Sequence, residues 1–175
     1  MTEIIKNDRI VDDSWRVLRL EEGESPETVD LPPEPTLFPL SVWRARKAAL
    51  LSRAETAGVW LASIDTPEEI ADGDGTLGIL GILPIVGIDF PKFSDGRGYS
   101  SARLLRERFH FKGEIRAIGD VLQDQLFLMK RCGIDAYAVR PDKDIRAALT
   151  GLTGFSESYQ GGVDEPLPLF RRRKA

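Results

Sequence analysis

The chain has few of the side chains that hold metals or form disulfides. Its 175 residues include one cysteine, Cys132, and one histidine, His110. This count excludes a disulfide within the chain, an iron–sulfur cluster held by four thiolates, and a zinc site of the Cys/His type. We therefore expect no metal site and no resident cofactor. A redox role would require a bound organic molecule, or a partner, that carries the electrons.

Long apolar runs and an excess of basic residues are also missing. The longest apolar stretch, residues 77–88, is interrupted by three glycines and a proline and is shorter than the ~18 residues of a membrane span. The net charge of −4 argues against general nucleic-acid binding. The start, MTEIIKND, lacks the basic-then-apolar pattern of a signal peptide. We expect a cytoplasmic protein that binds neither membranes nor nucleic acids.

The length suits one compact core, and the composition divides the chain into regions. Residues 1–20 predict an N-terminal hairpin, with strands IIKN and WRVLRL and a turn at Asn7-Asp8 or Asp12-Asp13. Residues 21–36 are acidic, contain four prolines and predict a linker. We expect a single α/β domain over residues 1–160, with β/α units in 37–160 and a flexible tail in 161–175.

From Leu37 onward, apolar runs alternate with helical patterns about five times. The runs are LFPL, GVWLASI, LGILGILPIVGIDF, GEIRAIG and IDAYAV. This alternation predicts a mainly parallel sheet with right-handed crossovers. Both an open doubly wound sheet and a partial β/α barrel fit, because strand order is not visible in the sequence. The match GDGTLG to a dinucleotide fingerprint is rejected, since no strand precedes it and no helix follows it.

Ligands of parallel α/β sheets bind in the loops outside the carboxyl ends of the strands. Three charged loops follow predicted strands here, namely residues 90–99, 119–120 and 140–142. We expect these loops to lie at the same end of the sheet. This topological inference is the strongest indication of a site that the residues themselves provide.

The first of these loops contains DGRGYS. Asp95 to Gly98 predict a tight turn, and Ser100 opens a helix whose free N–H groups favour anions. Arg97, beside Tyr99, would complete a cradle for phosphate, sulfate, sulfite or a carboxylate, although a purely structural clamp also fits. Arg103 and Arg106 lie opposite the apolar face of this helix. They predict either a partner surface or a solvated face with an Arg103–Glu107 pair.

The next predicted helix carries a polar residue within its apolar stripe. Gln125 must find hydrogen-bond partners there or cost roughly 1–3 kcal/mol, so it either bonds the backbone or faces a pocket or an interface. Asp120 fits an N-cap, with Gln123 three residues on. Asp124 and Arg131 form a charged stripe beside it, and Cys132 is predicted to be an inert thiol.

These motifs together resemble a known family. The pattern comprises DGRGYS, RLLRER, GDV followed by DQ, and RCG followed by DA, all within about 45 residues. It is similar to that of an uncharacterised bacterial family described as oxidoreductases involved in sulfite reduction. The resemblance implies a role in sulfur assimilation, with sulfite reductase as the partner.

Two hypotheses follow from the residues and the resemblance. In the first, the chain is an accessory protein without its own redox centre, which docks on sulfite reductase through the Arg/Asp surface of residues 95–131. In the second, it is an enzyme or carrier that binds a small oxyanion at the DGRGYS loop, where Arg97, Tyr99 and Asp120 act on the ligand. The sequence is also compatible with a homo-oligomer.

Overall fold

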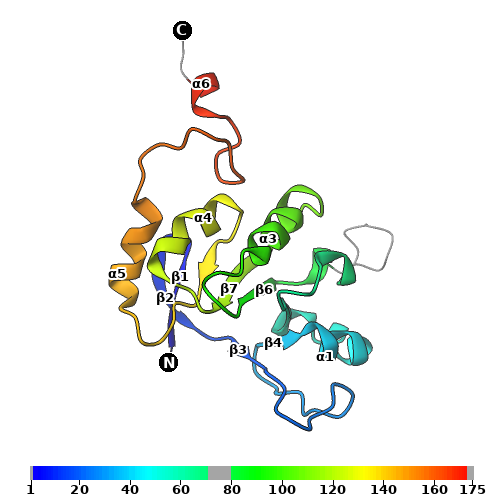
Figure 1. The fold of residues 1–175 in the computed structure, drawn as a ribbon. Coiled ribbons are helices and arrows are strands. Elements are labelled where there is room, and N and C mark those ends of the chain that lie inside the picture. The colour runs from blue at the N-terminus through cyan, green and yellow to red at the C-terminus, as the bar shows by residue number, and fades with distance from the viewer. Residues whose placement is uncertain (1, 71–79, 173–175) are drawn as a thin grey trace.

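The computed structural model describes residues 2–70 and 80–172, and its strands form one sheet (Figure 1). The order across the sheet is β2-β1-β8-β7-β6-β5-β4-β3. The strands are β1 (Thr2–Lys6), β2 (Arg9–Asp13), β3 (Arg16–Val17), β4 (Thr36–Pro39), β5 (Ala57–Leu61), β6 (Ile85–Phe90), β7 (Glu114–Gly119) and β8 (Ala136–Tyr137). The helices are α1 (Leu40–Ala45), α2 (Lys47–Leu51), α3 (Arg97–Glu107), α4 (Leu126–Arg131), α5 (Ile145–Leu149) and α6 (Leu169–Arg172).

The sheet is mixed, and its order decides between the two predicted architectures. Strands β3 to β8 pair in parallel, each beside the next strand along the chain. Strand β1 is antiparallel to both β2 and β8. A doubly wound sheet requires a reversal of strand order, and none occurs here among the described strands. The partial β/α barrel is therefore the alternative that fits, although the expected mainly parallel sheet holds only from β3 to β8.

The sheet curls, as a short connection shows. Strands β2 and β3 form its opposite edges, yet only Ser14 and Trp15 separate them along the chain. Three residue steps span at most about 11 Å, so the two edges come this close where β2 ends and β3 begins. The face toward which the sheet curls is called the inner face below.

The predicted N-terminal hairpin exists, but with a different second strand. Asn7 and Asp8 form its turn with φ of 49° and 61°, as two-residue hairpin turns require. This turn fixes the register, so Arg9–Asp13 rather than WRVLRL pairs with β1. The assignment of WRVLRL to the hairpin was wrong, because only Arg16–Val17 forms a strand there, at the other edge of the sheet beside β4.

The five predicted β/α units are only partly present, because several helices are short. A helix was expected to start at DTPEEIA, and the described part of that segment, residues 65–70, forms a single 3-10 turn, Pro67–Glu69, with a capping box between Thr66 and Glu69 at its start. The helix predicted for residues 120–133 begins as a 3-10 turn, Gln123–Gln125, and continues as α4. Asp144 caps α5 by accepting a hydrogen bond from the Arg146 N–H. The rejected GDGTLG motif lies outside the described residues.

The two faces of the sheet have different cores. Sequential right-handed crossovers place the helices on one face, where Val86, Ile88 and Phe90 of β6 join the main hydrophobic cluster. Alternation along the strands directs other residues to the inner face, where a smaller cluster comprises Leu37, Trp60, Ile85 and Ile118 with Trp15 packed against it.

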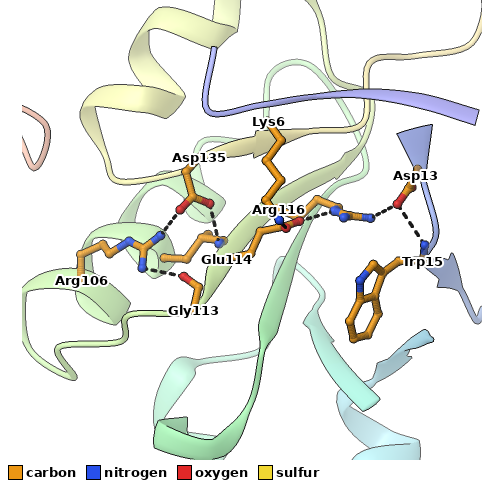
Figure 2. Close-up of polar contacts among 9 residues, drawn as sticks. Lys6, Asp13, Trp15, Arg106, Gly113, Glu114, Arg116 and Asp135 are labelled. Atoms are coloured by element: carbon orange, nitrogen blue, oxygen red, sulfur yellow. Dashed lines mark hydrogen bonds and ion pairs between the residues drawn. The ribbon is translucent and has the colours of Figure 1, made fainter. Parts of the chain in front are cut away.

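A buried ion network crosses the inner face (Figure 2). Arg116 of β7, only 2% exposed, donates to Glu114 at 2.6 Å and to Asp13 at 2.8 Å. Lys6 of β1 lies 2.6 Å from the other oxygen of Glu114. Asp13 also accepts the Trp15 N–H at 3.0 Å, which holds the short connection between the sheet edges. The network therefore joins β7 to β1 and β2 across the curl.

Replacing Arg116 by methionine tests this role. Arg116→Met leaves Asp13 without its arginine partner and Glu114 with only Lys6. We expect the free energy of unfolding to fall by about 3–5 kcal/mol, the usual cost of breaking a buried ion pair. Urea denaturation followed by circular dichroism measures the change.

The matched control is Arg146→Met, since Arg146 is exposed and its guanidinium lies 3.8 Å from the Glu3 carboxylate. This variant should unfold within about 0.5 kcal/mol of the unmodified chain. Equal losses in the two variants would contradict a structural role for the network.

Candidate functional site

A pocket of about 380 Å³ opens at the carboxyl ends of β6 and β7. This is the end at which β/α barrels and parallel sheets place their ligands. Four charged side chains line it, Arg19, Asp89, Asp120 and Arg140, and the remaining wall is formed by Phe90, Pro91 and Gly119. This carboxyl-end pocket is the candidate functional site.

Asp120 joins the three loops that the sequence placed at this end. Its carboxylate accepts the Phe93 N–H at 2.9 Å and a guanidinium N–H of Arg140 at 2.6 Å. Its own N–H donates to the Phe90 carbonyl at 2.7 Å. The expectation that the loops share one end of the sheet is therefore confirmed.

Arg19 reaches the pocket from the N-terminal segment. Its two terminal nitrogens donate to the two oxygens of the buried Asp89, at 2.6 and 3.4 Å. Its guanidinium carbon lies 5.0 Å from the centre of the Trp60 ring. The indole N–H of Trp60 donates to the Leu18 carbonyl at 2.9 Å, which fixes the backbone beside Arg19.

Arg140 forms the other basic wall. It donates to Asp142 through Nε at 2.6 Å and through Nη2 at 3.0 Å, in addition to its contact with Asp120. Hydrogen bonding to Asp142 first, and then to Asp120, raises the pKa of Arg140. In return Arg140 lowers the pKa of Asp142 to about 2. Arg140 is therefore a permanent cation held in a defined orientation.

Gly119 is required by the close packing of the pocket wall. Its φ is +91°, a conformation that residues with a side chain rarely adopt. A Cβ there would lie 2.6 Å from the Phe90 carbonyl oxygen and 2.7 Å from an oxygen of Asp89. Glycine thus lets β7 end directly against the Asp89 carboxylate.

The DGRGYS loop lies beside the pocket, and its arginine binds within the loop. Arg97 is exposed and donates to Asp95 through Nε at 3.0 Å and Nη2 at 2.7 Å. Hydrogen bonds from Arg97 lower the pKa of Asp95. Arg97 does not line the carboxyl-end pocket. Its role as an anion clamp stays a prediction.

Two expectations for the start of this helix need correction. Helix α3 begins at Arg97, so the exposed Ser100 lies within its first turn and does not open it. Gly98 is buried, and a Cβ there would lie 2.7 Å from the Phe90 ring. Gly98, the second glycine of the motif, therefore allows α3 to approach β6. It lies inside the helix and not in the turn before it, because the helix starts one turn earlier than the serines suggested.

Tyr99 and Gln125 support the pocket from behind. Tyr99 packs edge-on against Phe90, with ring centres 5.3 Å apart, and burial raises its pKa. The Gln125 side chain accepts the Leu122 N–H at 3.0 Å and donates to the Phe93 carbonyl at 3.2 Å. Of the alternatives predicted for Gln125, the structure therefore shows the one in which its side chain bonds the backbone. Gln125 also caps its own turn, so the assignment of Asp120 as the N-cap was wrong.

The two arginines of α3 differ in role. Arg103 is exposed and pairs with Glu107 at 2.9 Å, as predicted. Arg106 is mostly buried and donates to the carbonyls of three residues, Phe111, Gly113 and Gly133, and to Asp135 at 2.7 Å (Figure 2). Placing Arg106 on a solvated or partner face was wrong, because α3 packs against the loop before β7 and the turn after α4.

The remaining predicted residues lie on or near α4. Arg131 binds Asp164 at 3.3 Å and the Gln160 carbonyl, and its own carbonyl accepts the Val163 N–H at 2.8 Å. It thereby holds the segment after α5. Asp124 is exposed. Cys132 is half-buried, and burial raises the pKa of its thiol, as befits an unreactive side chain.

Of the four charged pocket residues, only Asp120 was predicted from the sequence as a site residue, and Arg140 was predicted only as part of a candidate loop. Asp89 and Arg19 were missed. Asp89 gave a usable signal, since a single carboxylate inside the apolar run IVGIDF requires a buried partner. Arg19 gave none. It lies 70 residues away in the chain, and only the curl of the sheet brings it to Asp89.

Comparison with known families identifies the group to which the chain is related. The model of a bacterial family of proteins of unknown function, DUF934, matches residues 58–170. The chain belongs to the DUF934 family. Three of the charged pocket residues, Asp89, Asp120 and Arg140, lie in the DUF934 segment, whereas Arg19 precedes it. A comparison with curated proteins gave no match. The connection to sulfite reduction stays a prediction.

Within residues 2–70 and 80–172, no helix is long and apolar enough to cross a membrane. The same described ranges contain no group of three or more His, Cys, Asp or Glu side chains placed to hold a metal ion.

The difference between Arg106 and Arg103 can be measured. Arg106→Met removes the side-chain donor of three carbonyls and leaves Asp135 with only the Ile115 N–H. We expect a loss of about 3 kcal/mol in the free energy of unfolding. Arg103→Met removes only an exposed i,i+4 pair on the same helix, worth about 0.3–0.5 kcal/mol. Parallel urea titrations compare the two variants, and similar midpoints would refute the structural role of Arg106.

Proposed function

We propose that the chain binds a small oxyanion of the sulfite or sulfate class in the carboxyl-end pocket, and that it serves sulfite reduction in this way. The observation that carries the proposal is the presence of two arginines, Arg19 and Arg140, on the walls of one pocket at the carboxyl end of the sheet. Guanidinium groups bind planar and tetrahedral oxyanions through paired N–H donors.

Both arginines are oriented by carboxylates and retain donors for a ligand. Of the five N–H bonds of Arg19, two are directed at Asp89, which leaves three within the described contacts. Arg140 uses one toward Asp120 and two toward Asp142, which leaves two. The carboxylates orient the two guanidinium groups before a ligand binds. Little side-chain entropy of Arg19 and Arg140 is therefore lost on binding.

The composition supports a binding role more than an independent redox role. One cysteine and one histidine cannot form a thiolate-held cluster. The resemblance of the DGRGYS to RCG block connects the chain with sulfite reductase. Holding sulfite or sulfate for that enzyme requires no electron carrier on this chain.

Anion binding is tested with two double variants that remove the same charge. Isothermal titration with sodium sulfite and sodium sulfate, against sodium chloride at equal ionic strength, should show a saturable site in the unmodified chain. Arg19→Met with Arg140→Met should weaken binding at least about tenfold, because two charge-assisted contacts are lost. Arg97→Met with Arg103→Met should bind as the unmodified chain does.

The variant Arg97→Met with Arg103→Met distinguishes binding in the pocket from general charge effects. If this variant loses as much affinity as the Arg19→Met, Arg140→Met variant, the anion is held by overall charge or by the DGRGYS loop, and the carboxyl-end pocket is not the site. Sulfate raises melting temperatures nonspecifically. A rise in melting temperature with sulfate therefore indicates specific binding only where it exceeds the rise seen in the Arg19→Met, Arg140→Met variant.

A second candidate function, docking on sulfite reductase, is favoured by the C-terminal segment. The chain after α5 is held to α4 where Arg131 contacts Asp164, and from there it leads away from the sheet to α6 (Figure 1). Phe155, Tyr159 and Phe170 in this segment are 68%, 66% and 58% exposed. The rings of Tyr159 and Phe170 lie 6.3 Å apart, and Phe155 lies against Phe127 of α4. Exposed aromatic side chains are typical of protein interfaces. Of the predicted Arg/Asp surface, Arg97, Arg103 and Asp124 also remain exposed.

Docking is tested with purified sulfite reductase. The unmodified chain should co-elute with the enzyme in size-exclusion chromatography, and Phe155→Ser with Phe170→Ser should abolish co-elution because buried aromatic contacts dominate interface energies. Ile64→Ser, which removes an 80% exposed side chain from a loop elsewhere on the surface, is the control. Absence of a complex with the unmodified chain would reject this candidate and leave the anion-binding proposal unaffected.

A further inference from the structure

Arg19 lies in a segment with little regular structure of its own. Strand β3 consists of only Arg16–Val17, and the chain turns into an acidic, proline-rich region after Leu20. The Arg19 side chain is half exposed. An arginine on such a segment would sample many rotamers, so its place in the pocket must be fixed by contacts with other elements.

Two residues of the sheet supply these contacts. Asp89 holds the guanidinium from one edge and occupies two of its donors. Trp60 lies against the guanidinium with its ring, and its indole N–H holds the Leu18 carbonyl. Trp60 is itself nearly buried on the inner face, in the cluster with Leu37 and Ile85, so its orientation is set by the core.

The ring contact differs from the carboxylate contact in one important respect. A cation over an aromatic face is stabilised without using an N–H donor. Trp60 can therefore fix the plane of the Arg19 guanidinium while its remaining donors stay available. An additional carboxylate in the same place would have occupied donors and added a negative charge beside the two aspartates of the pocket.

We propose that Trp60 is a positioning residue for anion binding, which acts by holding Arg19 at the pocket wall through its ring and through the Leu18 carbonyl. This inference rests on the proposed function of the carboxyl-end pocket. It extends that function to a side chain which does not line the pocket, and it explains how a residue outside the DUF934 segment joins the site.

A double-mutant cycle on the full chain tests the inference. The dissociation constant for inorganic sulfite and for sulfate is measured by isothermal titration for Trp60→Leu, Arg19→Met and the combined variant. Trp60→Leu should bind ~3- to 10-fold more weakly. If Trp60 acts through Arg19, the combined variant should be no weaker than Arg19→Met alone, whereas independent effects would add.

Two further variants guard against a loss of fold. Trp60→Phe keeps a ring beneath Arg19 and should bind more tightly than Trp60→Leu. Ile85→Val removes a methyl group from the same inner-face cluster and should leave the dissociation constant unchanged. Anion-dependent fluorescence should persist in Trp43→Phe and weaken in Trp60→Phe, because Trp43 is buried among the helices, whereas Trp15 stays at the inner-face cluster in both variants.

The outcomes separate this inference from the proposed function. If the unmodified chain binds neither anion, both are overturned. If the unmodified chain binds the anions, and both Trp60→Leu and Trp60→Phe bind them as tightly as the unmodified chain does, only the positioning role of Trp60 is overturned. Additive losses in the combined variant, or an equal loss in Ile85→Val, would likewise refute action through Arg19.

Discussion

The buried contact of Arg116 with Asp13 and Glu114 is the constraint on which the rest of the structure depends. It joins β7, near the middle of the sheet, to the end of β2 at its edge, and so holds the sheet in its curled form. A buried guanidinium requires compensating carboxylates, and here they come from positions 103 and 2 residues away in the chain. Because Asp13 also accepts the Trp15 N–H, the same contact directs the chain from one sheet edge to the other and thereby leads Arg19 to the pocket.

The curl explains why the charged residues at the carboxyl ends act together. In a flat sheet, the loops after β6, β7 and β8 would form a row, and the N-terminal segment would lie far from them. In the curled sheet, Arg19 meets Asp89 on one side, while Asp120 and Arg140 meet on the other. Each arginine is held by a carboxylate and keeps donors free. The pocket therefore combines two permanent cations with little conformational freedom, an arrangement suited to a small oxyanion.

The arginine-rich block that carries the family resemblance serves the fold as much as a site. Arg106 replaces missing backbone partners at three carbonyls, Arg131 holds the segment after α5, and Gly98 allows α3 to contact β6. Gln125 connects the turn before α4 to the loop after β6. In this chain, several residues of the recognisable motif therefore support the fold. Arg97 and Arg103 remain on the surface, where a partner can reach them.

The sequence by itself determined that strands alternate with helical segments, and the end of the sheet at which the loops gather. It also included the turn at Asn7-Asp8 and the Arg103–Glu107 pair among its alternatives. Each of these depends on local periodicity, on turn chemistry or on the direction of parallel strands. Only the tertiary structure decided the strand order, the second strand of the hairpin, the burial of Arg106 and the entry of Arg19 into the pocket. These depend on contacts between residues far apart in the chain. Local patterns do not encode such contacts, because the partner of a charged side chain is selected by the packing of the whole sheet.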